Sequence, residues 1–217
     1  LPCLRIKNTN KYFSLQNCSF LNGKYGVYFS NISNAYIENS KFLFSNNGGV
    51  KTINCVNLRF EDNLIANNSN IGLEIAYSTQ FLFLRNNITF NHIGTNLTDS
   101  TFMDIKFNYY KDSTMGVFSS QCSNIDISFN QFYHNNYAIY LSKTNFSFIR
   151  SNTGEHNNFT IIENDCILNT IFGNFPSPEN DGPSVYYFDF TILLIVVSIG
   201  IGIWTFVKFV FTPHKFK

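Results

Sequence analysis

The chain has 217 residues, a formal net charge of +1, 13% charged residues and 18% aromatic residues. Its 44% hydrophobic content, combined with so few charges, excludes a disordered acidic or basic chain. A net charge this close to zero gives no electrostatic footprint for nucleic acid, so we expect no nucleic-acid partner.

Residues 1–11 show no regular pattern and are predicted to form an irregular N-terminal segment. The sequence begins with Leu1 rather than methionine, which favours a truncated or processed chain. A signal peptide removed from a longer chain would leave no trace here.

A repeat of 22–23 residues follows this segment. Its first marker is asparagine, found at Asn17, Asn39, Asn63, Asn86, Asn108, Asn130, Asn152 and Asn174. Its second marker is mostly glycine, found at Gly26, Gly49, Gly72, Gly94, Gly116, Ala138 and Thr160. Glycine at this phase predicts a bend with backbone angles that other residues avoid. A fixed period of this length predicts a solenoid.

Apolar and polar residues alternate within each repeat, as in Ile125–Phe132, and this alternation is typical of a strand. The sequence therefore predicts a parallel β-helix of about seven coils over residues 12–175, in which equal phases stack at about 4.8 Å. One inward ladder is expected to consist of Asn63, Asn86, Asn108, Asn130, Asn152 and Asn174. Asparagine suits this role because its amide offers both a donor and an acceptor to backbone groups left open at a bend.

The frame Ile-x-Phe-Asn-x-Phe/Tyr occurs at Ile105–Tyr110 and again at Ile127–Phe132. It resembles the repeats of right-handed parallel β-helix proteins of the NosD and pectate-lyase-like superfamily. The resemblance covers about residues 12–175 and implies an all-β, right-handed solenoid. The superfamily has carbohydrate-binding and sugar-cleaving members, so the resemblance implies the fold rather than one function.

Cysteine recurs at one phase of the repeat, at Cys55, Cys122 and Cys166. Cys122 and Cys166 would lie two coils apart, beyond the reach of a disulfide. We therefore expect free thiols at this phase. Cys3 and Cys18 are left as two cysteines that a disulfide could join.

Stacked ionisable residues provide the candidate chemistry. Asp104 and Asp126 are 22 residues apart, so they would stack on adjacent coils as a candidate acid–base pair or Ca²⁺ site. Lys106, Ser128 and Arg150 share a neighbouring phase and are candidate carbohydrate-binding residues. The alternative is a solvated face on which Lys106 neutralises the acids.

Asp112, His134 and His156 each follow a ladder asparagine by four residues and would fall on consecutive coils. Carboxylate and imidazole are ligands suited to Zn²⁺ or Cu²⁺, so this row is a candidate metal site. A single row would give a line of ligands rather than a convergent shell. No other cofactor is expected.

Beyond the repeat, residues 176–188 form a linker rich in proline and glycine. Residues 189–211 are predicted to form a transmembrane helix, because Phe190–Val207 is uncharged and mostly apolar. The basic tail, residues 212–217, belongs in the cytoplasm by the positive-inside rule, which places the β-helix outside a cell membrane on a single span.

Glycosylation sequons fit an outward-facing domain, and the candidates are Asn31, Asn67, Asn87, Asn96, Asn145 and Asn158. Asn17 also heads a sequon, but we expect it on the inner ladder and therefore unmodified.

The favoured functional hypothesis is a membrane-anchored extracellular β-helix that binds carbohydrate, mediates adhesion or builds an envelope. One alternative is a polysaccharide lyase or glycoside hydrolase of the pectin-lyase-like fold, whose paired carboxylates would flank the scissile bond. The resemblance to NosD implies a second alternative, a metal-handling accessory protein.

Overall fold

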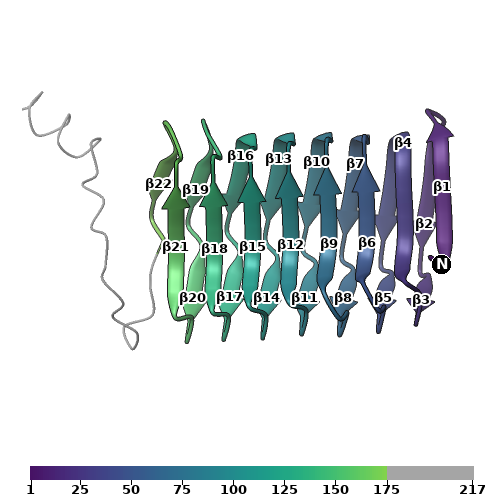
Figure 1. Cartoon of the computed structure of the whole chain (residues 1–217), viewed down its shortest axis with the longest axis horizontal. Helices are drawn as coiled ribbons and strands as arrows, with labels where there is room; N and C mark the ends of the chain where they lie inside the picture. The colour runs from purple at the N-terminus through teal and green to yellow at the C-terminus, as the bar shows by residue number, and fades with distance from the viewer. Residues whose placement is uncertain (175–217) are drawn as a thin grey trace, which may run out of the picture. The chain divides into compact units, whose positions relative to one another are not determined.

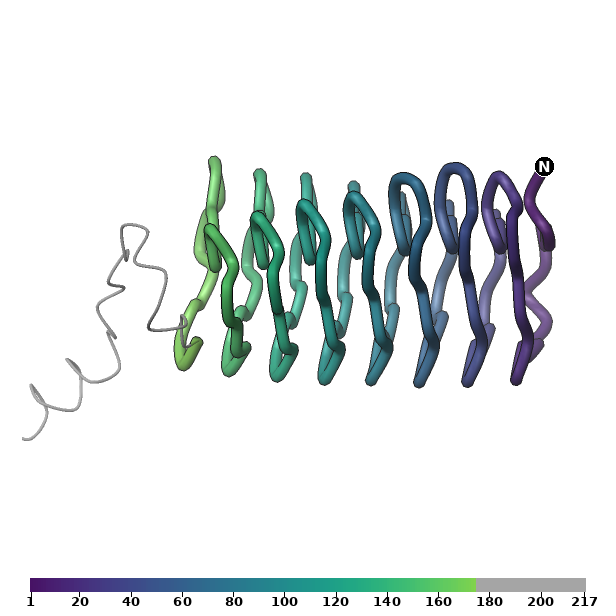
Figure 2. Tube along the Cα trace, turned by 90° about the horizontal axis from the view of Figure 1, so that it is seen from below, coloured from purple at the N-terminus to yellow at the C-terminus, as the bar shows by residue number. Residues whose placement is uncertain are grey.

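The computed structural model describes residues 1–174, so the predicted linker, transmembrane helix and tail lie outside the described residues. The described part consists of 22 β-strands without a helix, and each strand runs parallel to its neighbours. Each coil except the last described one contributes a strand to each of three stacks of strands, which we name sheets A, B and C, and β4 runs from sheet A into sheet B (Figure 1). Figure 2 shows the successive coils stacked along one axis.

Sheet A contains β1 (Leu4–Thr9), the first half of β4 (Tyr25–Glu38), β6 (Gly48–Ile53), β9 (Ile71–Ala76), β12 (Ile93–Thr98), β15 (Met115–Ser120), β18 (Tyr137–Ser142) and β21 (Phe159–Asn164). Sheet B contains β2 (Phe13–Gln16), the second half of β4, β7 (Val56–Glu61), β10 (Thr79–Leu84), β13 (Thr101–Lys106), β16 (Ser123–Ser128), β19 (Phe148–Arg150) and β22 (Thr170–Phe172). Sheet C contains β3 (Ser19–Leu21), β5 (Lys41–Leu43), β8 (Leu64–Ala66), β11 (Asn87–Thr89), β14 (Tyr109–Lys111), β17 (Gln131–Tyr133) and β20 (Thr153–Glu155).

The solenoid has about eight coils rather than the predicted seven. The additional coil is the first one, because residues 4–9, which were predicted to be irregular, form β1. β1 pairs with β4 from Leu4 opposite Val27 to Thr9 opposite Ile32. Alternation in Leu-Arg-Ile-Lys was the available signal, and it was missed because no asparagine or glycine marker accompanies it.

Left-handed backbone conformations turn the chain between the strands. One coil, for example, has positive φ at Asp99, Phe102, Phe107 and Asp112. These residues lie between sheets A and B, inside the sheet B strand, between sheets B and C, and between sheets C and A. Asparagine and aspartate tolerate this conformation better than most residues, and ten asparagines and four aspartates are among the residues with positive φ.

The glycine markers have a different role from the one predicted. Gly72, Gly94 and Gly116 lie inside sheet A strands, and their φ values are not positive. A Cβ at Gly116 would lie 2.6 Å from the carbonyl oxygen of Ala138 and 2.7 Å from the ring of Phe132. Glycine is therefore required by close packing against the large interior residues of sheet C, not by a bend.

The predicted asparagine ladder runs through the bend between sheets B and C. Oδ1 of Asn130 accepts hydrogen bonds from the backbone and side-chain N–H groups of Asn108, at 2.9 and 3.0 Å. Its own amide donates to the carbonyl of Ile105 at 2.8 Å and to Asn152 Oδ1 at 3.0 Å. The same pattern links the row from Asn63 to Asn174.

Asn17 does not belong to this ladder, so its predicted place on the inner ladder was wrong, and the repeat marker Asn39 lies outside the ladder as well. Both are exposed residues with positive φ, one position before the ladder phase. The ladder phase is occupied by Cys18 and Ser40 instead, and Ser40 N–H donates to Asn63 Oδ1 at 2.9 Å. The spacing from Asn39 to Asn63, two residues longer than the common period, was the sign of this slip.

A second asparagine ladder, missed in the sequence, runs through the turn between sheets C and A. Its asparagines are Asn68, Asn91, Asn135 and Asn157. Oδ1 of Asn157 accepts from both N–H groups of Asn135, at 2.9 and 3.1 Å, and the Asn157 amide donates to the carbonyl of Phe132 at 2.8 Å. Each of these asparagines follows a residue of the first ladder by five positions, a spacing that could have revealed it.

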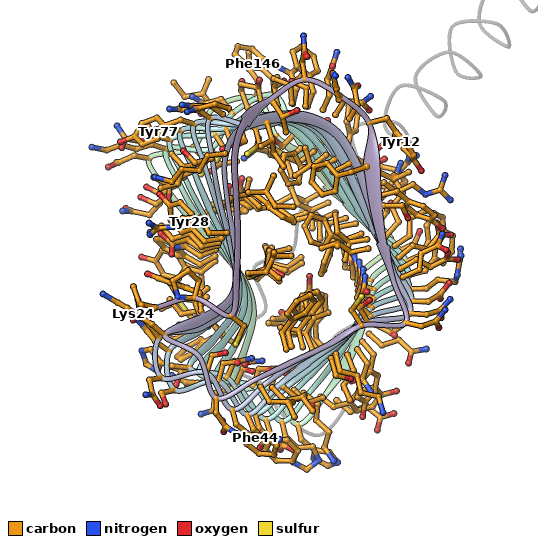
Figure 3. The ribbon with its side chains drawn as sticks, turned by 90° about the vertical axis from the view of Figure 1, so that its right-hand side faces the viewer. Tyr12, Lys24, Tyr28, Phe44, Tyr77 and Phe146 are labelled. Atoms are coloured by element: carbon orange, nitrogen blue, oxygen red, sulfur yellow. The ribbon has the colours of Figure 1, made fainter. Side chains whose placement is uncertain are left out.

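Side chains from all three sheets fill the interior, as the view along the axis shows (Figure 3). Tyr110 and Phe132 are fully buried and stacked, with ring centroids 4.9 Å apart and an interplanar angle of 7°. Cys55 and Cys122 are buried free thiols, and Cys166 is partly buried and free. Cys3 and Cys18 are also free, so no disulfide joins the cysteines, which all lie among the described residues.

Candidate functional site

The charged residues predicted to stack on sheet B come together on its outer face. Asp104 and Asp126 are register partners on β13 and β16. Lys106 Nζ lies 2.9 Å from a carboxylate oxygen of each aspartate, and Arg150 Nη2 lies 2.9 Å from Oδ2 of Asp126. We name these four residues and Ser128, which lies between Lys106 and Arg150 in the same row, the sheet B polar cluster.

Charge pairing decides what the cluster can do. Burial raises the pKa of Asp126, but the contacts of its carboxylate with Lys106 and Arg150 outweigh burial and hold the pKa below its usual value. Burial likewise lowers the pKa of Lys106, but its two aspartates hold it above the usual value. Asp126 therefore stays ionised near neutral pH and is poorly suited to donate a proton.

Ser128 is fully buried, although it was predicted as an exposed carbohydrate-binding residue. Lys106 and Arg150, its neighbours in the row, have long side chains that both pair with Asp126. Asp126 lies on the same strand as Ser128, β16. Only Lys106 and Arg150 of the three predicted binding residues thus reach the surface.

A second charged group lies on the N-terminal side of the same face. Glu61 is buried and receives hydrogen bonds from the Tyr36 hydroxyl at 3.0 Å and from Arg59 Nε at 2.6 Å, and it is also paired with Arg85. Burial raises the pKa of Glu61, but these three partners hold it below its usual value. The Glu61 carboxylate has its hydrogen-bond and charge partners within the protein, so we assign this group a structural role.

The lowered pKa of Glu61 predicts a loss of stability in acid. A carboxylate whose pKa is depressed by folding stabilises the native state above its unfolded pKa, about 4.3, and this contribution disappears as the pH falls through the lower folded pKa. Glu61→Gln should therefore reduce stability at neutral pH and flatten its decline below about pH 4. Urea unfolding at a series of pH values measures the free energy of unfolding of each variant. Glu155→Gln, at an exposed position, is the control. Parallel dependence of stability on pH in Glu61→Gln and the native chain would contradict the prediction.

Sheet A presents a different outer face, which was missed in the sequence. At its N-terminal end, the Arg5 guanidinium lies 4.9 Å and Lys7 Nζ 5.7 Å from the centroid of the Tyr28 ring. Lys51 Nζ lies 5.6 Å from the centroid of the Tyr25 ring. Figure 3 shows Tyr28 directed away from the interior on this side of the coil. The arrangement exposes cations held against aromatic rings.

Aromatic side chains continue this face at its C-terminal end. Tyr137 and Phe159 are stacked, with centroids 4.9 Å apart, and Tyr140 packs edge-on against Tyr137 at 5.7 Å. Phe118 lies 5.7 Å from Tyr140 on the preceding coil. Phe118 and Tyr140 are register partners, as are Tyr137 and Phe159, so the four rings form two short rows. We name the rings and cations of both ends together the sheet A aromatic face.

The comparison with known families settles the fold. The family described as a right-handed β-helix region matches residues 2–118, more than half of the chain. The chain belongs to this right-handed β-helix family. Its right hand and its repeat architecture agree with the sequence prediction.

Two solved right-handed β-helix structures resemble this one. A mutant of the periplasmic alginate epimerase AlgG has a TM-score of 0.60 at 13% identity, over 75% of this chain and 50% of that one. The Azotobacter vinelandii mannuronan C-5 epimerase AlgE6 A-module has a TM-score of 0.61 at 13% identity, over 79% of this chain and 59% of that one. The chain thus spans little more than half the length of these structures. A search of curated proteins gave no match.

The predicted metal row lies at the turn between sheets C and A of this right-handed β-helix. Asp112, His134 and His156 all have positive φ and follow one another on consecutive coils. The rings of His134 and His156 have centroids 4.9 Å apart. The Asp112 carboxylate is instead close to a lysine, with Oδ2 3.6 Å from Lys111 Nζ. Within residues 1–174, no group of three or more His, Cys, Asp or Glu side chains is arranged to hold a metal ion.

All six sequon asparagines are exposed or partly exposed on the β-helix. Asn31, Asn67, Asn87 and Asn158 are exposed, and Asn96 and Asn145 are partly exposed. Asn17 is exposed as well, so the reason for setting it aside was wrong. The described residues contain no helix long and apolar enough to cross a membrane, and the predicted span at residues 189–211 lies outside them.

Proposed function

We propose that this chain is a carbohydrate-binding β-helix module, and that the sheet A aromatic face binds an acidic polysaccharide. The observation that carries the proposal is the presence of partly exposed rings and of cations on the outer side of one sheet, with cations at its N-terminal end and stacked rings at its C-terminal end. Aromatic rings supply flat apolar surface for the faces of sugar rings. Arg5, Lys7 and Lys51 supply positive charge for carboxylate groups. Glu74 is paired with Lys51 at 2.6 Å and cancels one of these three charges, so the N-terminal end of the face keeps a net positive charge.

The geometry of a parallel β-helix supports a linear ligand. Equal positions repeat along the axis at the strand spacing of about 4.8 Å, so one face offers evenly spaced contacts to a polymer laid along it. The two similar structures are named as an alginate epimerase and a mannuronan C-5 epimerase, and these names support a polysaccharide as the class of ligand. The lyase or hydrolase alternative remains a prediction.

We also propose that the module is displayed outside a cell on a C-terminal membrane anchor. The support is the uncharged run Phe190–Val207 followed by a basic tail. Sequons on the surface of the β-helix are consistent with this location.

Binding of alginate by the full chain, compared with binding of neutral dextran, tests the proposed ligand class. We expect a preference for alginate that weakens with added salt, because exposed charges are screened. Tyr137→Ala/Tyr140→Ala should weaken alginate binding by about tenfold through the loss of two stacking surfaces. Arg5→Gln/Lys7→Gln should reduce both the affinity and its dependence on salt.

The matched control is Tyr109→Ala/Tyr133→Ala, a tyrosine pair with centroids 5.4 Å apart on the outer face of sheet C. Equal binding of alginate and dextran would refute the acidic ligand. Equal losses in the two tyrosine double variants would refute the location on sheet A. Release of new reducing ends or a changed uronate composition in the same mixture would instead favour the enzymatic alternative.

A further inference from the structure

Three buried polar atoms in the sheet B polar cluster have no hydrogen-bond partner within the described protein. They are Asp126 Oδ1, Ser128 Oγ and Arg150 Nε. Their residues are neighbours on β16 and β19, where Ser128 is the register partner of Arg150. Buried polar groups are ordinarily paired, so this concentration at one place marks a point where a polar ligand group is missing.

The chemistry of the three atoms is that of a hydroxyl-binding site. A carboxylate oxygen accepts, the Nε–H of arginine donates, and a serine hydroxyl does either. A single hydroxyl group, which has one donor and two acceptor positions, can satisfy all three. A charged ligand fits less well, because Asp104 and Asp126 are already balanced by Lys106 and Arg150.

Exposed aromatic rings adjoin these polar atoms. Phe148 is the register partner of Asp126 and is 50% exposed. Phe129 follows Ser128 in the chain, is 46% exposed, and stacks on Phe107 with centroids 5.2 Å apart. A polar centre beside flat apolar surface is suited to a sugar, whose ring has hydroxyl edges and an apolar face.

Access to the polar atoms depends on Arg150. Its side chain is 38% exposed, and its ion pair is with Asp126. A partly exposed side chain changes rotamer readily, so a ligand hydroxyl can enter by moving the guanidinium while keeping a hydrogen bond to it. Lys106 would continue to contact both aspartates during this movement, and the guanidinium would stay close enough to balance the second negative charge.

We propose that sheet B carries a second carbohydrate site, in which Asp126, Ser128 and Arg150 bind one hydroxyl of a neutral sugar unit whose ring lies on Phe148. The site differs from the sheet A aromatic face in location and in charge. It does not depend on the proposed binding of an acidic polysaccharide.

Titration of the full chain with neutral hexasaccharides of glucose, mannose and galactose tests this site, in a detergent without a sugar headgroup. We expect at least one hexasaccharide to bind, with affinity lowered about tenfold by Phe148→Ala and severalfold by Ser128→Ala. The controls are Ser123→Ala on the same strand and exposed Phe90→Ala at the turn between sheets C and A. Neither control should change the affinity.

Three outcomes overturn the proposal: no hexasaccharide binds, the affinity is unchanged in either Ser128→Ala or Phe148→Ala, or a control weakens it equally. Phe148 is exposed, so its variant keeps the test decisive even where Ser128→Ala impairs folding. Tyr137→Ala/Tyr140→Ala should leave this binding intact, which separates failure of this site from failure of the sheet A aromatic face.

Discussion

Alanine in place of Phe132 is expected to lower the free energy of unfolding by about 3–5 kcal/mol, the usual cost of removing a buried phenylalanine ring. The ring is 1% exposed, stacks on Tyr110 on one side and packs against the Gly116 backbone. On the next coil its register partner is Gly154, which has no side chain to fill the space. The site therefore cannot collapse easily, which places the expected cost at the upper end of the range.

Urea unfolding of the full chain, followed by circular dichroism, measures this loss. The matched control is Phe129→Ala, three residues earlier, which removes the same ring from an exposed stacked pair. We expect the control to change stability by less than about 1 kcal/mol. Similar losses in the two variants would show that the interior stack does not carry the stability assigned to it.

The comparison of Gly116 with Ala138 explains why glycine recurs and where it can be lost. Gly94 and Gly116 each face the large sheet C residue of their own coil, Tyr110 and Phe132 respectively. In the following coil both positions change together, to Ala138 and Gly154. A sequence shows the glycine period but not which residues oppose one another across the interior. The bend interpretation failed for this reason.

Periodicity alone predicted the parallel β-helix and the buried row from Asn63 to Asn174. It failed in the first coils because asparagine has two uses in this fold. Asn39 occupies a left-handed backbone position, whereas the ladder position beside it is held by Ser40. Composition cannot separate these uses, since both favour asparagine, and only the register of the strands distinguishes them.

The candidate sites were predictable to different extents. The 22-residue spacing correctly placed Asp104 beside Asp126, and the ion pairs of Lys106 with both aspartates agree with the alternative in which Lys106 neutralises the acids. The burial of Ser128 was not predictable, because it depends on the conformations that Lys106 and Arg150 adopt. The sheet A aromatic face could have been found by aligning outward positions such as Phe118 and Tyr140, but this requires knowing which strand residues face outward.

The largest polar effect is expected from Asn130→Ala, which should lower the free energy of unfolding by about 3–4 kcal/mol. Three buried groups lose a hydrogen bond: the backbone N–H of Asn108, the carbonyl of Ile105, and the side-chain amide of Asn108, which keeps only its bond to the Phe83 carbonyl. Each unsatisfied buried group costs about 1–3 kcal/mol. Asn87→Ala, at an exposed position of sheet C, is the matched control and should be close to neutral.

A double-mutant cycle tests whether the asparagines act as a connected ladder. In Asn108→Ala/Asn130→Ala the side-chain amide of Asn108 is absent, so it can no longer be left unpaired by the loss of Asn130. The double variant should therefore lose about 1–2 kcal/mol less than the sum of the two single variants. Asn63→Ala/Asn130→Ala, whose residues share no hydrogen bond, should be additive. Additivity in both cycles would mean that each asparagine stabilises its own bend independently.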